Sequence, residues 1–126
     1  LYQPMHFDRQ AEHAAGDAKT SFAPFFTWSR GNLRCRANSS LVRKGYAVHD
    51  SEMDQELVKA LAAIDEVTSS QDLWIEAPLE RGQIQYLNNH ELGHYRSEFE
   101  DSDDAATKRH LYRLWHRADG GINYDG

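Results

Sequence analysis

The chain has 126 residues and a formal net charge of -6, so it supports one domain at most and is small for a complete enzyme. The negative charge argues against general binding to a nucleic-acid backbone. No apolar run approaches the ~20 residues of a membrane-spanning helix, so we expect no membrane partner. Because the sequence opens on Leu1 with no signal region before it, we expect a fragment, a single partial domain over residues 1–126.

The first third of the chain predicts a β-hairpin after an irregular start. Residues 1–20 are mostly small and polar and predict no regular element. Residues 22–29 are rich in aromatic side chains, residues 29–32 form a turn, and residues 33–37 alternate apolar and charged side chains. The alternation predicts that the second strand buries Leu33, Cys35 and Ala37. As the only cysteine, Cys35 cannot form an internal disulfide, and it fits a reducing cytoplasm.

One long helix and several short strands are predicted for the rest. The helix begins at Ser51 and ends near Ser69, with Asp54 in a capping-box-like relation to Ser51 and Glu52 favourable near the positive helix end. Its apolar stripe recurs at three and four residues and consists of Met53, Leu57, Leu61, Ile64 and Val67. Short strands follow at residues 73–77, 84–87, 94–99 and 109–117. This order predicts a mainly β fold with one long helix, part of a β-sandwich or jelly roll.

A five-residue motif, His90-Glu91-Leu92-Gly93-His94, has the H-E-x-x-H spelling of a zinc peptidase. That chemistry requires both imidazoles on one helical turn, with the glutamate activating a metal-bound water. The preceding residues 82–89 alternate like a strand and end in two asparagines, which are poor helix formers. We therefore predict that His90 and His94 are not one turn apart on a helix. The peptidase remains an alternative, as does an ordinary polar role for both histidines.

A longer stretch points to a different chemistry. The sequences GQIQYLNNH (residues 82–90), LGHYRSEFED (92–101) and KRHLYRLW (108–115) resemble the C-terminal end of the taurine dioxygenase family of Fe(II)/2-oxoglutarate oxygenases. Residues 4–10 and the strand pair at 25–36 resemble the preceding part of that domain, so the similarity covers nearly the whole chain. The resemblance implies the C-terminal half of a double-stranded β-helix, or jelly roll. It also implies His94 as the distal iron ligand, Arg113 at the far carboxylate of 2-oxoglutarate, and Arg109 assisting at its other end.

The pattern around Arg113 agrees with this role. On a strand, one face would carry Arg109, Leu111, Arg113 and Trp115. An arginine between apolar neighbours is costly in an interior unless an anion meets it, and the planar guanidinium fits a carboxylate in bidentate fashion. On the pattern alone, Arg113 also fits an exposed arginine on an amphipathic strand, and His94 fits a polar strand residue.

The family's remaining iron ligands are a His-x-Asp or His-x-Glu pair, for which this chain offers only His6-Phe7-Asp8. The resemblance aligns those residues with a later segment of the family's domain. His6 and Asp8 are therefore the ligand pair only in an alternative interpretation. The implied enzyme oxidises a small-molecule substrate and releases succinate and carbon dioxide. Without the pair, we expect a non-catalytic binding module. We also expect exposed sheet edges, which leave the chain marginally stable or associated as a homo-oligomer.

Overall fold

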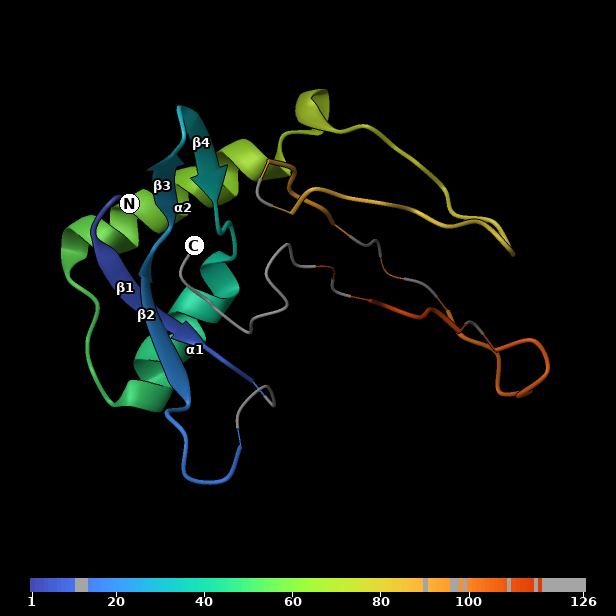
Figure 1. Cartoon of the computed structure of the whole chain (residues 1–126), viewed down its shortest axis with the longest axis horizontal. Coiled ribbons are helices and arrows are strands. Elements are labelled where there is room, and N and C mark those ends of the chain that lie inside the picture. Colours follow the sequence, from blue (N-terminus) through green and yellow to red (C-terminus); the bar gives the residue numbers. More distant parts are fainter. Residues whose placement is uncertain are drawn as a thin grey trace.

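The computed structural model describes residues 1–10, 14–89, 91–95, 98, 100–108, 110–114 and 116. In chain order the elements are β1 (Pro4–Asp8), β2 (Thr20–Pro24), β3 (Phe26–Ser29), β4 (Asn32–Cys35), α1 (Ser39–His49), α2 (Gln55–Ser69) and the 3-10 helix η1 (Gln71–Leu73). Figure 1 shows two small sheets and two helices, with a long extended segment leading away from them, and the β1–β2 sheet packs on α1. Within the described residues, no helix is long and apolar enough to cross a membrane.

The first sheet is an antiparallel pair of β1 and β2, with Pro4 opposite Pro24 and Asp8 opposite Thr20. Side chains alternate along β1, so Met5 and Phe7 are buried while their neighbours are not. The expectation of irregular structure before residue 20 was therefore wrong. The strand has only two buried apolar positions, among a proline and polar or charged residues. This pattern is too short to predict a strand from the sequence.

The second sheet is the predicted hairpin, formed by β3 and β4. Its turn residues Arg30 and Gly31 both have positive φ, of 51° and 80°, as a two-residue hairpin turn of the primed type requires. The predicted buried face was wrong, because Leu33 is 41% exposed, Ala37 is exposed and Cys35 is only half-buried. Leu33 lies near the turn opposite the exposed Trp28, beyond the reach of the core.

The helix α1 is a correction to the prediction of a single long helix. Asn38 caps its start by accepting a hydrogen bond from the Leu41 N–H, and Asp50 ends it in the left-handed conformation. Gly45 explains both the packing and the missed prediction. It faces β1 so closely that a Cβ there would lie 2.5 Å from the His6 carbonyl oxygen. A glycine inside a helix lowers the propensity that sequence reasoning detects, although the fold requires it for this approach.

The second helix, α2, confirms the long helix predicted from its apolar stripe, although it begins at Gln55 rather than Ser51. Asp54 accepts a hydrogen bond from the Leu57 N–H and so sets the start. Leu61 from the stripe is fully buried, while Val67 at its end is 54% exposed. The buried core cluster comprises Met5, Phe7, Phe25, Val42 and Leu61.

A polar contact joins the two helices beside this core. Asp65 of α2 accepts hydrogen bonds from the Ser39 hydroxyl and the Arg43 guanidinium, the latter at 2.6 Å. The Ser39 hydroxyl, followed by Arg43, holds the pKa of the Asp65 carboxyl below its usual range, against the opposing effect of burial. Both side chains of the ion pair are more than 40% exposed, so it orients the helices more than it stabilises them.

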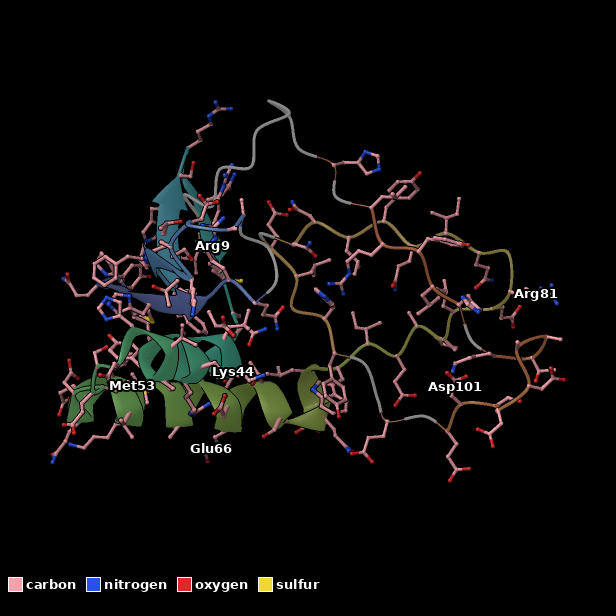
Figure 2. All side chains as sticks on the ribbon, turned by 90° about the horizontal axis from the view of Figure 1, so that it is seen from below. Arg9, Lys44, Met53, Glu66, Arg81 and Asp101 are labelled. Atoms are coloured by element: carbon pink, nitrogen blue, oxygen red, sulfur yellow. The ribbon has the colours of Figure 1, made fainter. Side chains whose placement is uncertain are left out.

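Beyond Leu73 the described residues form turns and extended backbone without a strand ladder, so none of the four strands predicted there is present in the described part. The segment runs away from the sheets and helices (Figure 1). Arg81 and Asp101 lie far from Met53 and Glu66 of the packed part (Figure 2). A strand needs a hydrogen-bonded neighbour as well as alternation, and this stretch supplies only the alternation. The prediction of half a jelly roll is therefore not confirmed by the described residues.

Candidate active site

The structure brings together two of the residues predicted for the site. Arg113 and His94 lie 19 positions apart, and the Arg113 NH2 group is 3.5 Å from the His94 Nε2 atom. This distance is the outer limit for a hydrogen bond, and the guanidinium donates only when the proton of the neutral imidazole is on Nδ1. Both side chains are exposed. The pair therefore places a metal-binding type of side chain next to a carboxylate-binding one.

Aromatic contacts accompany this pair. Trp74 and Tyr95 stack with ring centroids 5.4 Å apart, and Tyr86 lies 6.5 Å from the ring of His116. Both contacts join a residue before the motif to a residue after it. Sequence reasoning missed Trp74 and Tyr95 as residues of the site. The only signal in the sequence was that the aromatic Tyr95 directly follows the candidate ligand His94. Aromatic residues are common in strands, so this signal is weak.

The H-E-x-x-H motif does not lie on a helix in the part that the structure describes. The Glu91 and Leu92 N–H groups donate to the Asn88 carbonyl, which makes a turn, and residues 92–95 are in neither a helix nor a strand. His90 lies outside the described residues, so the separation of the two imidazoles stays a prediction. A zincin site needs helical spacing, which the backbone around His94 does not provide.

The alternative ligand pair, His6 and Asp8, is engaged in other contacts on β1. The His6 ring stacks on His49 of α1, with centroids 3.8 Å apart and the planes tilted by 23°. Asp8 accepts a hydrogen bond from the Gln10 N–H. Burial, followed by the charge of His49, lowers the pKa of the His6 imidazole below its usual value.

The described residues contain no group of three or more histidine, cysteine, aspartate or glutamate side chains placed to hold a metal ion. His94 supplies one nitrogen ligand of the type that iron(II) accepts, so the described part of the site fits such an ion only in part. Arg109, the predicted assistant at the cosubstrate, lies outside the described residues. The described residues therefore place one side chain of a metal-binding type next to one of an anion-binding type.

The class of protein follows from a comparison with known families. The family model described as "Taurine catabolism dioxygenase TauD, TfdA family" matches residues 8–115, a span that contains His94, Arg109 and Arg113 and begins after His6. This chain belongs to that family, whose members are generally Fe(II)/2-oxoglutarate-dependent dioxygenases. The family also implies a jelly-roll fold. A search of curated proteins gives no significant match.

Proposed function

We propose that this chain forms the iron-ligand and cosubstrate-binding part of an Fe(II)/2-oxoglutarate-dependent dioxygenase acting on a small molecule. His94 is the distal iron ligand, Arg113 receives the far carboxylate of 2-oxoglutarate, and Arg109 assists at the other end. The observation that carries the proposal is the 3.5 Å approach of Arg113 to His94, which lies inside the span matched by the family.

The two side chains suit these tasks by their chemistry. A neutral imidazole offers one nitrogen lone pair to a metal. With the proton on Nδ1 that lone pair lies on Nε2, the atom next to Arg113, so iron would bind there in place of this contact. A guanidinium presents parallel N–H donors that match a carboxylate in a bidentate pair, which fixes both position and direction. When bound, iron and 2-oxoglutarate supply the oxidising power, with release of succinate and carbon dioxide. The role of this chain is to bind and orient them.

A second candidate, a non-catalytic binding module, is favoured by one observation. The described residues do not hold a full set of metal ligands, and a single imidazole forfeits most of the affinity of a facial three-ligand site. Exposed apolar side chains in residues 74–116 also favour association, including the formation of a homo-oligomer.

Assaying succinate formation from 2-oxoglutarate, with iron(II) and ascorbate, tests the proposal in the intact gene product. We expect turnover in the wild type, its loss in His94→Ala, and no change in the control His110→Ala, whose exposed imidazole also belongs to the extended segment. Retained turnover in His94→Ala contradicts the assignment of the ligand.

The same assay applied to residues 1–126 alone separates the two candidates. We expect no turnover, because the described residues supply only part of the ligand set. Turnover by this chain that disappears in His6→Ala would show that His6 and Asp8 complete the site, and would exclude the binding module.

A further inference from the structure

Trp74 links the end of α2 to the extended segment. Its indole N–H donates to the Thr68 carbonyl at 2.9 Å, and its backbone N–H donates to the Gln71 carbonyl at 3.0 Å. The last carbonyls of a helix have no partner within that helix, so the indole satisfies one of them. The side chain of Trp74 is therefore held against the end of α2, while its backbone bonds to η1, and the residue is 40% exposed.

Tyr95 is held in turn by Trp74. The two rings stack at 5.4 Å with their planes 29° apart, a favourable arrangement for an aromatic pair. Tyr95 directly follows His94 in the chain. Holding the Tyr95 ring against Trp74 therefore restrains the backbone next to His94, whose imidazole lies 3.5 Å from Arg113.

We propose that Trp74 and Tyr95 are positioning residues, which anchor residues 92–95 to the C-terminal end of α2 and thereby orient His94 toward Arg113. The inference rests on the proposed function, because this orientation serves a reaction only if His94 binds iron. The anchor acts through His94, and neither aromatic side chain needs to touch the cosubstrate. If Trp74 only caps α2, that role requires the indole N–H alone. Loss of the Tyr95 ring would then not change the orientation of His94.

Substitutions can remove the cap and the stack separately. Trp74→Phe keeps a ring for stacking but loses the N–H donor, whereas Tyr95→Ala keeps the cap but loses the stack. Tyr95→Phe retains the ring and serves as the conservative rescue. Trp28→Ala is the matched control, because this tryptophan of β3 is 66% exposed and lies in the other part of the chain.

The readout is a nuclear Overhauser cross-peak between the ring protons of His94 and the side-chain protons of Arg113, recorded on residues 1–126 without iron. We expect the cross-peak in the wild type, Trp74→Phe, Tyr95→Phe and Trp28→Ala. In Tyr95→Ala it should weaken by about two- to tenfold, as the loss of one aromatic pair allows. Far-UV circular dichroism should show that α2 is retained in Tyr95→Ala.

Two results overturn the proposal: an absent cross-peak in the wild type, or an unchanged one in Tyr95→Ala. Should Trp74→Phe unfold the end of α2, the decision still rests on Tyr95→Ala, which leaves the cap in place. Iron(II) and 2-oxoglutarate binding are measured separately in the intact gene product. A wild type that binds neither contradicts the proposed function, whatever the cross-peak shows, so the two failures are distinguishable.

Discussion

The two parts of the chain differ in how much apolar surface they enclose. Residues 1–73 contain both sheets, both helices and the buried core that includes Phe7, Phe25 and Leu61. In the described part of residues 74–116, Ile75 and Tyr112 are 93% and 94% exposed. The accessible surface of the chain is 10777 Å², against roughly 6900 Å² for a compact monomer of its mass.

This difference separates the residues that stabilise the fold from the residues proposed to bind iron and 2-oxoglutarate. The packed part holds the side chains whose burial stabilises the fold, while the extended part carries His94 and Arg113, which the family assignment makes the residues of interest. A carboxylate-binding arginine is most effective where water is excluded, so the exposed pair needs further enclosure to reach full strength. The contrast predicts that substitutions in residues 1–73 alter stability, whereas substitutions in residues 74–116 alter binding.

The largest effect on stability is expected from Leu61→Ala. Leu61 is fully buried between the helices and the sheets, so its truncation should cost about 2–5 kcal/mol in the free energy of unfolding. The matched substitution Ile84→Ala removes a side chain that is 77% exposed and should change stability by less than about 0.5 kcal/mol. Denaturant unfolding followed by circular dichroism measures both. Equal losses would break the distinction between the two parts.

A smaller effect on stability is expected where the chain packs backbone against backbone. Gly45→Ala places a Cβ 2.5 Å from the His6 carbonyl oxygen, so α1 must move away from β1. This should outweigh the gain in helix propensity and destabilise the fold by about 1–3 kcal/mol. Gly93→Ala is the control, because a Cβ there has no atom within 4 Å and Gly93 does not have positive φ. Thermal unfolding compares the two, and a stabilised Gly45→Ala would contradict the close packing of α1 on β1.

The smallest effect on stability concerns pH. Burial, together with the charge of His49, lowers the pKa of His6 in the folded chain, so the fold favours the neutral imidazole. The resulting stability is present above the unfolded value of about 6.5 and is lost as pH falls through the lower folded pKa. The thermal midpoint should therefore fall between pH 7.5 and 5 more in the wild type than in His6→Phe, which cannot titrate. In His110→Gln, a control in the exposed segment, the fall should match the wild type.

Local patterns in the sequence predicted the elements with strong periodicity. The stripe through Leu57 and Leu61 identified α2, and the turn at Arg30 and Gly31 identified the hairpin. The helix α1 was missed because Gly45 is required by contact with β1, which no local pattern contains. The buried face of β4 was misassigned for the same reason, since burial depends on what lies opposite rather than on alternation.

The candidate site was predictable from a resemblance rather than from spacing alone. That resemblance singled out His94 and Arg113, and the structure places them within 3.5 Å, although their roles stay predictions. The contact between Trp74 and Tyr95 was not predictable, because it joins residues far apart in the sequence through a stack. The alternation at residues 84–87 predicted a strand, but a ladder also needs a partner, which the described residues of this segment do not supply.

The most direct test of the account is the affinity for 2-oxoglutarate of Arg113→Lys, titrated in the intact gene product with iron(II) and without oxygen. An ammonium cannot reproduce a bidentate guanidinium pair, so affinity should fall by about 2–4 kcal/mol, or roughly 30- to 900-fold. Arg81→Lys, at a turn of the same segment, should bind like the wild type. An unchanged affinity in Arg113→Lys would contradict the assignment of the cosubstrate site.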